Sequence, residues 1–321
     1  MILGKKIRDC VPRIATDLPE SVVQCAVETD QLVNKCVDRV TDSLKQPAAQ
    51  YTEMHRGHLA QMFFSMRHTH FTIRKLLQEE QHPTNVDAMP LARCQLETLF
   101  AICLIVEQPN FMDAYLKHGW KMQYLYHLVL VEQCRDLPRL RANLDVCVQA
   151  LDGMRKLACV TDEEKATIDE SEIGTPLPAG FNRKPIPKFP APGEVITRIQ
   201  NANRQKMLLR LYPEYQFLCT YVHASPHGRS FRALFDKRQP FGEKLFTSGQ
   251  LEEMFMKEIA APAILLDLLS LAQCCAEFVS VYPRDVELRG VLSEAWGALL
   301  DNTLIGRAVW ELHTKQLLGV L

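Results

Sequence analysis

Residues 259–282 read IAAPAILLDLLSLAQCCAEFVSVY, an apolar run that is long enough to cross a membrane. Three polar residues, Asp267, Gln273 and Glu277, interrupt the run, and Pro262 lies near its start. A charge at the middle of a bilayer is costly, whereas a helix that is apolar nearly all round also suits the interior of a large protein. The run therefore predicts a buried core helix, and we expect no membrane insertion.

The remainder of the chain has the spacing of helices packed around such a core. Apolar residues recur every three or four positions, and no sustained apolar and polar alternation is bounded by hairpin turns. We therefore predict an all-α fold, a multi-helix bundle of about ten helices. The expected helices cover approximately residues 18–46, 49–80, 84–108, 111–134, 138–159, 161–170, 195–224, 229–238, 249–281, 285–300 and 303–318.

Residues 171–194 interrupt this pattern with six of the chain's 18 prolines and no helical period. Such composition is typical of an extended, semi-rigid connection. Because neither half of the chain differs from the other in composition, we expect a single helical domain over residues 1–321. Residues 1–17 are expected to form an N-terminal segment that can be loose.

Composition limits the classes of function. With 37 basic and 38 acidic residues, the net charge of -1 does not favour a dedicated nucleic-acid-binding protein. The N-terminal residues carry lysines and arginines but no apolar segment typical of a secretory signal, so we expect a cytoplasmic protein whose 11 cysteines are reduced. No Cys-x-x-Cys pair occurs, and we expect neither a metal nor a cofactor.

Three helices carry polar residues among apolar neighbours. Arg93 and Glu97 lie four residues apart and therefore share a helix face, where the planar guanidinium can bind an anion. Lys121 lies in an aromatic stretch of the next helix, where a lysine must find a partner or reach solvent. The stretch YPEYQFLCTYVHASPHG, residues 212–228, aligns Tyr215, Cys219 and His223 along one stripe before the helix ends at a proline. Cys219 is a poor candidate nucleophile, because no neighbour in the sequence orients His223 as its base.

These stretches together resemble a known family. LARCQLETLFAICLIVEQPNFMDAYLKHGWKMQYLY, residues 91–126, followed by residues 212–228, is similar to the microbial domain-of-unknown-function family 5677. The resemblance covers about half of the chain and implies an α-helical fold without an established activity. The residues that it highlights are Arg93, Glu97, Tyr115, Lys121, Tyr215, His223, Ser225 and Pro226.

Two further signals are weaker. His55, His58, His68 and His70 lie close in sequence, but their spacing does not direct all four at one metal ion. Arg307 and His313 have the spacing of the Arg-x(4–6)-His element of HEPN-type helical ribonucleases, although Ala308 stands where that element usually carries a polar residue.

Three hypotheses follow. The first is a binding protein that holds a polar or anionic ligand in an interhelical pocket around Arg93, Glu97, Lys121, Tyr215 and His223. The second is a HEPN-like, metal-independent ribonuclease in a defence or toxin system, with His313 as general base and Arg307 as phosphate clamp. The third is a non-catalytic scaffold in which the polar cluster sets helix register. The ligand or protein partner is not indicated, and a homo-oligomer is compatible with the sequence.

Overall fold

The computed structural model describes residues 21–48, 50–78, 86–134, 137–222, 226–235, 242, 245–283, 285–302 and 304–319. Within these ranges the chain is helical and has no strand. The described part of the chain consists of helices packed on one another, so the predicted all-α multi-helix bundle is confirmed.

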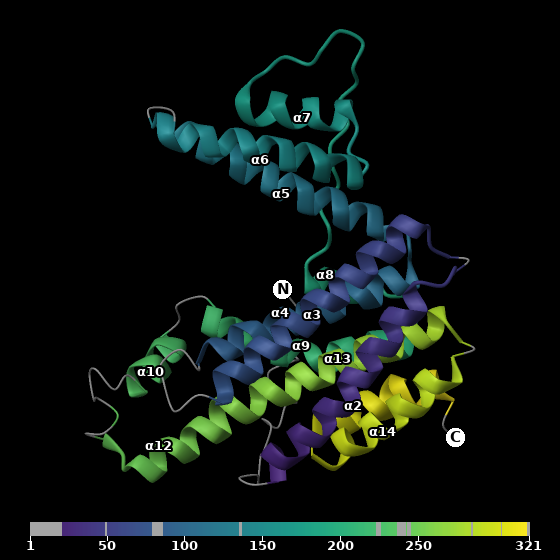
Figure 1. Cartoon of the computed structure of the whole chain (residues 1–321), viewed down its shortest axis with the longest axis vertical. Coiled ribbons are helices and arrows are strands. Elements are labelled where there is room, and N and C mark those ends of the chain that lie inside the picture. The colour runs from purple at the N-terminus through teal and green to yellow at the C-terminus, as the bar shows by residue number, and fades with distance from the viewer. Residues whose placement is uncertain are drawn as a thin grey trace. The chain divides into compact units, whose positions relative to one another are not determined.

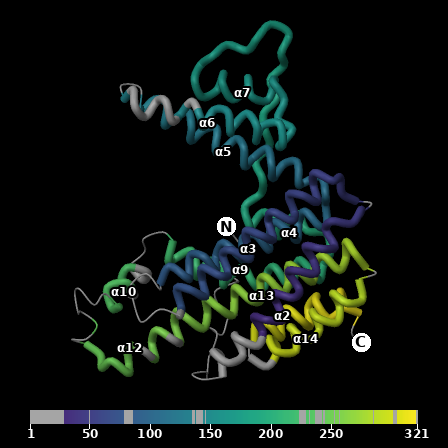
Figure 2. Tube along the Cα trace, in the orientation of Figure 1, coloured from purple at the N-terminus to yellow at the C-terminus, as the bar shows by residue number. Residues whose placement is uncertain are grey.

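The chain forms two compact units, which Figure 2 allows the reader to follow by residue number. The first consists of residues 1–107 and 192–321, and the second of residues 108–191. Each unit is defined by the contacts among its own residues, and such contacts do not show that the unit folds independently. The expectation of one helical domain over residues 1–321 therefore stays a prediction.

The first unit contains most of the helices. They are α2 (Ser21–Leu44), α3 (Glu53–Gln78), α4 (Ala88–Glu107), α8 (Pro192–Arg198), α9 (Ala202–Val222), α10 (Pro226–Leu234), α12 (Ser248–Phe255), α13 (Ala261–Val281), α14 (Val286–Asn302), α15 (Leu304–Val309) and α16 (Lys315–Leu318). Two π-helical segments, η2 (Met256–Ala260) and η3 (Trp310–Thr314), join α12 to α13 and α15 to α16. Such segments are often found at functional sites in helical proteins.

Helix α13 is the centre of the first unit (Figure 1), and α2, α3, α4 and α14 pack against it. Most of its apolar side chains and four polar ones, Asp267, Ser270, Gln273 and Glu277, are buried. By length and composition, two helical stretches of the described chain pass for membrane spans, Ala88–Glu107 and Ser248–Val281. In both, most of the apolar window is buried by the protein itself, as expected for the core helix predicted over residues 259–282.

The second unit contains α5 (Phe111–Gln133), α6 (Pro138–Leu157) and α7 (Asp162–Ile173). Trp120, Ala158, Val160, Ile168 and Ile186 form its small core. Of these, Ile186 comes from the proline-rich segment, so that part of the segment packs onto the helices.

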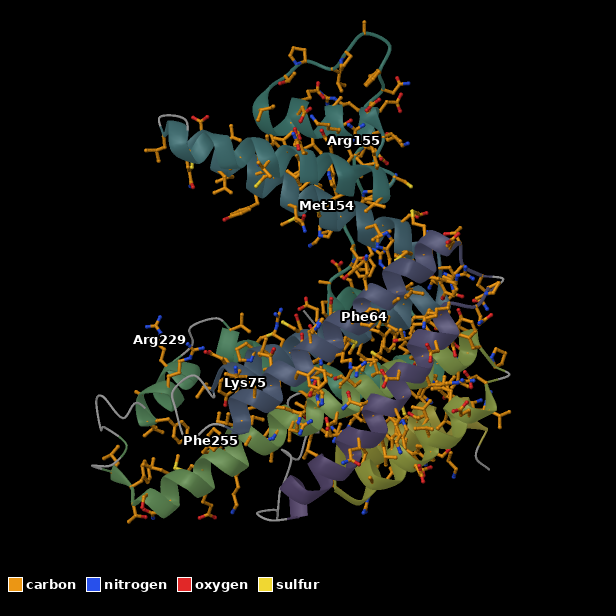
Figure 3. All side chains as sticks on the ribbon, viewed as in Figure 1. Phe64, Lys75, Met154, Arg155, Arg229 and Phe255 are labelled. Atoms are coloured by element: carbon orange, nitrogen blue, oxygen red, sulfur yellow. The ribbon has the colours of Figure 1, made fainter. Side chains whose placement is uncertain are left out.

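The side chains of α6 shown in Figure 3 illustrate how this helix is attached within the second unit. Met154 packs against the core cluster, and the Nε atom of Arg155 donates to the carbonyl oxygen of Val160 at 3.2 Å. The indole Nε1 of Trp120 donates to the carbonyl oxygen of Leu151 at 2.9 Å. The Val160 oxygen lies beyond the end of α6, so Arg155 supplies a donor to the main chain that follows the helix.

Several predicted helix ends differ from the observed ones. Helix α10 begins at Pro226, three residues before the predicted start, because proline suits the first turn of a helix. Helix α8 begins at Pro192, inside the segment predicted to be extended. Residues 1–17 and the predicted start of the helix over 84–108 lie outside the described residues.

Candidate functional site

Arg93 on α4 and Tyr215 on α9 lie in contact, as expected if the two helices meet. The Nη2 atom of Arg93 donates to the hydroxyl oxygen of Tyr215 at 2.8 Å, and its Nε atom donates to Sγ of Cys219 at 3.1 Å. The Cζ atom of Arg93 lies 5.0 Å from the centroid of the Tyr215 ring, within the range of a cation–π contact. The guanidinium is thus held against one face of α9.

Tyr215 is itself fixed by aromatic neighbours. Its ring is stacked with Tyr212 at a centroid distance of 6.0 Å, and Phe100 of α4 lies 6.0 Å from it on centroids. Burial and the nearby Glu97 carboxylate raise the pKa of Tyr215 to about 12, although Arg93 opposes this. The phenol is therefore protonated at neutral pH. Because its oxygen accepts from Arg93, its own proton remains a hydrogen-bond donor, and the described residues offer no acceptor for it.

Glu97 completes the cluster but holds Arg93 only loosely. Its Oε2 atom lies 3.3 Å from Nη1 of Arg93, and the Glu97 side chain is 44% exposed against 18% for Arg93. An exposed ion pair of this length contributes little to stability. Burial lowers the pKa of Arg93, but Cys219, Glu97 and Tyr215 outweigh burial and hold this pKa above its ordinary value. The charge on Arg93 is permanent.

Two other predicted site residues belong to the second unit. The ring of Tyr115 packs against Phe189 at a centroid distance of 5.1 Å, and Lys121 is partly buried on α5. The structure places Tyr115 and Lys121 relative to the other residues of the second unit. His223 and Ser225 lie outside the described residues, and of Pro226 the structure describes only that it begins α10.

The proposed nuclease pair is divided between two environments. Arg307 is exposed, and its Nε atom donates to the carbonyl oxygen of Leu300 at 2.7 Å. His313 is 3% exposed, and its Nε2 atom lies 2.9 Å from Oε1 of Glu277. A general base must reach its substrate, so the burial of His313 does not favour the ribonuclease hypothesis.

The sequence reasoning did not foresee a buried charge network around Glu277. Arg204 of α9 donates from Nε and Nη2 to Oε2 of Glu277 at 3.0 and 2.7 Å, and Gln273 donates to Oε1 at 2.8 Å. Nη1 of Arg204 also donates to Oε2 of Glu107 at 2.5 Å. Burial raises the pKa of Glu277, but Arg204 and His313 outweigh it and lower that pKa to about 2. We refer to Glu107, Arg204, Gln273, Glu277 and His313 as the Glu277 network.

A π-helical segment supplies part of this network. His313 and the next residue, Thr314, both belong to η3 and both contact α13, since Thr314 Oγ1 donates to Oε1 of Gln273 at 2.6 Å. These two contacts tie the π-helical segment to α13 and give it a structural role.

A second buried network lies nearer the start of α13. The ring of His70 lies between two carboxylates: its Nδ1 atom contacts Oδ2 of Asp267, and its Nε2 atom lies 2.5 Å from Oδ1 of Asp30. Arg74 donates to Oδ2 of Asp30 at 2.5 Å, and Gln95 donates to Oδ1 of Asp267 at 2.6 Å. Burial lowers the pKa of His70, but Asp267 and Asp30 outweigh it and raise this pKa to about 9. The imidazole is therefore protonated and donates from both nitrogens.

One signal in the sequence pointed to both networks. Asp267, Gln273 and Glu277 interrupt an apolar run, and buried polar groups need partners. The partners themselves, His70 and Arg204, lie 197 and 73 positions away from their carboxylates. No local spacing connects positions that far apart.

Glu214, next to Tyr215 on α9, is a further buried acid that the sequence reasoning missed. It is 6% exposed, and the described part of the chain gives its carboxyl group no hydrogen bond or ion pair. Burial raises the pKa of Glu214, against the opposing charge of Arg210. Among the described residues, no three His, Cys, Asp or Glu side chains are arranged to hold a metal ion.

Comparisons with protein-family models, with curated proteins and with solved structures find no match to this chain. The resemblance to family 5677 therefore stays a prediction. The function has to be argued from the geometry of the chain's own residues.

Proposed function

We propose that this protein binds an anionic group, a carboxylate or a phosphate, at the cluster formed by Arg93, Glu97, Tyr215 and Cys219, which we call the Arg93 cluster. The observation that carries the proposal is a partly exposed guanidinium with a permanent charge, held in place by Tyr215 and Cys219. Preorganised donors of this kind bind anions with little loss of side-chain freedom.

The donors left over support this role. A guanidinium has five N–H groups, and the described contacts of Arg93 use one each from Nε, Nη1 and Nη2. Two N–H groups of Arg93 and the phenol proton of Tyr215 remain to bind a ligand. A planar fork with an adjacent hydroxyl matches the oxygens of a carboxylate or phosphate.

Glu97 acts in this proposal as an internal competitor for the guanidinium. Its ion pair with Arg93 is long and exposed, so an incoming anion can replace it at low cost. Glu97 also repels an anion bound beside Arg93. The proposal therefore predicts that substitutions of Arg93 and of Glu97 change anion affinity in opposite directions. A purely structural cluster predicts no such opposite effects.

The first prediction concerns anion binding by the full chain. We expect phosphate or succinate, tested at constant ionic strength, to raise the melting temperature in a saturable way. Arg93→Ala is expected to weaken binding at least tenfold, and Tyr215→Phe to weaken it by about tenfold through loss of one hydrogen bond to a charged group. Glu97→Gln is expected to tighten binding several-fold. Isothermal titration calorimetry measures all four proteins.

Arg67→Ala is the matched control for this experiment. Arg67 on α3 also has an ion pair, with Asp38 at 2.5 Å, and a cation–π contact, with Phe71 at 5.7 Å, but it lies outside the Arg93 cluster. Anion affinity should not change in this variant. The proposal is wrong if phosphate and succinate both fail to bind, or if Arg67→Ala and Arg93→Ala weaken binding equally.

A second candidate function is a non-catalytic helical scaffold. It is favoured by the Glu277 network and by the buried His70 site, in which the charged groups are paired with other protein groups. Buried pairs of this kind specify how helices pack more than they raise stability. In this case Arg93→Ala lowers the melting temperature, no anion binds, and Glu97→Gln has no effect on any affinity.

A further inference from the structure

The Arg93 cluster holds two opposite charges side by side. Nη1 of Arg93 lies 3.3 Å from Oε2 of Glu97, and both side chains belong to α4. The guanidinium is positive and the carboxylate is negative, so the pair has a dipole but no net charge. A ligand with two opposite charges at a similar spacing complements such a pair better than a simple anion does.

The Glu97 carboxylate has capacity for a cationic partner. Its side chain is 44% exposed, and the described part of the chain gives its Oε1 atom no hydrogen bond or ion pair. A carboxylate accepts at about four lone-pair sites. The long contact with Arg93 occupies one of them, so an ammonium group can bind Glu97 without displacing the guanidinium.

The donors beside Glu97 suit a carboxylate. Two N–H groups of Arg93 and the phenol proton of Tyr215 have no acceptor among the described residues. Glu97 is close enough to Tyr215 for its charge to raise the pKa of the phenol. The acceptor on Glu97 and the donors on Arg93 and Tyr215 therefore lie close to one another, in a single cluster.

A simple anion uses only part of this arrangement. It is attracted by Arg93, but it is also repelled by Glu97, whose carboxylate lies beside the same guanidinium. An ammonium group on the same ligand replaces this repulsion with an attraction. Glu97 then contributes to the affinity instead of reducing it.

Building on the anion-binding role proposed above, we propose that the Arg93 cluster binds an α-amino acid, a zwitterion with its carboxylate and ammonium on the same carbon. The ligand carboxylate accepts from Arg93 and Tyr215, and the ligand ammonium donates to Glu97. Because the two protein charges are only 3.3 Å apart, the two charges of the ligand must also be close together. An α-amino acid meets this requirement.

Pairs of ligands that differ only in the ammonium group test the proposal. Alanine is compared with propionate, and valine with isovalerate, by isothermal titration calorimetry of the full chain at constant ionic strength. We expect each amino acid to bind at least about threefold more tightly than its partner, an effect that an exposed ion pair can supply. In γ-aminobutyrate the ammonium lies two carbons further from the carboxylate, so this compound should bind no more tightly than butyrate.

Glu97→Gln should change the affinities for the two kinds of ligand in opposite directions. The amide no longer attracts the ammonium, so alanine should bind at least about threefold more weakly. The same substitution removes the repulsion of a simple anion, so propionate should bind more tightly. Asp38→Asn is the matched control, since Asp38 forms an exposed ion pair with Arg67 outside the cluster and should affect neither ligand.

The results distinguish an amino-acid site from a site for simple anions. If propionate or phosphate binds and neither amino acid is preferred, the amino-acid proposal is overturned and the anion-binding role stands. The amino-acid proposal also fails if Glu97→Gln changes the affinities for alanine and propionate in the same direction. It fails equally if neither amino acid shows saturable binding up to about 50 mM. Circular dichroism verifies that both variants keep their helices.

Discussion

At the residue scale, the most unusual feature is the protonated His70 between two aspartates. A buried charge is costly unless it is paired, and His70 is paired on both ring nitrogens. Asp30 and Asp267 come from α2 and α13, while His70 belongs to α3. One imidazolium therefore links three helices of the first unit.

The pKa of about 9 for His70 gives stability a definite pH dependence. Because the folded-state pKa lies above the unfolded value of 6.5, the stabilisation is fully present below pH of about 6.5 and is lost as the pH rises through about 9. A shift of this size corresponds to about 3 kcal/mol. We expect the free energy of unfolding to fall by up to this amount across that window, as measured by urea titrations at several pH values.

His70→Gln is expected to lower the free energy of unfolding by about 3–5 kcal/mol at pH 6.5, because two buried carboxylates lose their cation. The same variant should show a flatter dependence on pH across the window. His58→Gln is the control, since His58 is partly exposed on the same helix and its Nδ1 atom lies 3.2 Å from Oε1 of Gln61, away from the His70 site. A wild-type profile without any decline above pH of about 6.5 contradicts the assignment.

The sequence predicts Arg93, Glu97 and Tyr215 of the Arg93 cluster as site residues, and it places Cys219 on the same helix face as Tyr215. Arg93 and Glu97 share a face because they are four positions apart, and the same local rule aligned Tyr215 with Cys219. That Arg93 bonds to both Tyr215 and Cys219 depends on how α4 packs on α9. A spacing rule cannot supply that information.

At the element scale, α7 is the helix whose beginning is most fully explained by its sequence. Thr161 accepts from the backbone N–H of Glu164, and the Glu164 carboxylate accepts from the backbone N–H of Thr161. This capping box is the start that a threonine followed three residues later by a glutamate specifies. Lys117 of α5 donates to the same carboxylate at 2.6 Å, so the cap also attaches α7 to its neighbour.

Thr161→Ala is expected to destabilise the start of α7 by about 1 kcal/mol, because one backbone N–H loses its acceptor. Amides of residues 162–173 should then exchange hydrogen about fivefold faster, as hydrogen-exchange mass spectrometry measures. Ser171→Ala removes a hydroxyl near the other end of α7, where Ser171 donates to the carbonyl oxygen of Ile168. Equal acceleration in both variants would falsify a specific role for the cap.

At the scale of the whole molecule, the two compact units differ in how well they are buried. The first unit contains α13, whose side chains are buried almost throughout, whereas the second has a small core and several exposed apolar side chains on α5. Local stability follows the density of buried contacts. The units should therefore exchange hydrogen at different rates.

We expect amides of α13 to exchange more slowly than those of α5 by at least about tenfold. The measurement is hydrogen-exchange mass spectrometry on the full chain at low micromolar concentration. Helix α4, which is also largely buried, serves as an internal reference and should behave like α13. Exchange from α5 as slow as that from α13 would contradict this expectation.

The sequence by itself determined the all-α class, the buried core helix, the cap of α7 and the shared face of Arg93 and Glu97. Each of these follows from relations between residues a few positions apart, and helical periodicity encodes such relations directly. Only the tertiary structure decided that Asp267 and Asp30 enclose His70, that Glu277 binds Arg204, and that His313 is buried away from solvent. These pairings join helices far apart in the chain, and they depend on which helix faces pack together.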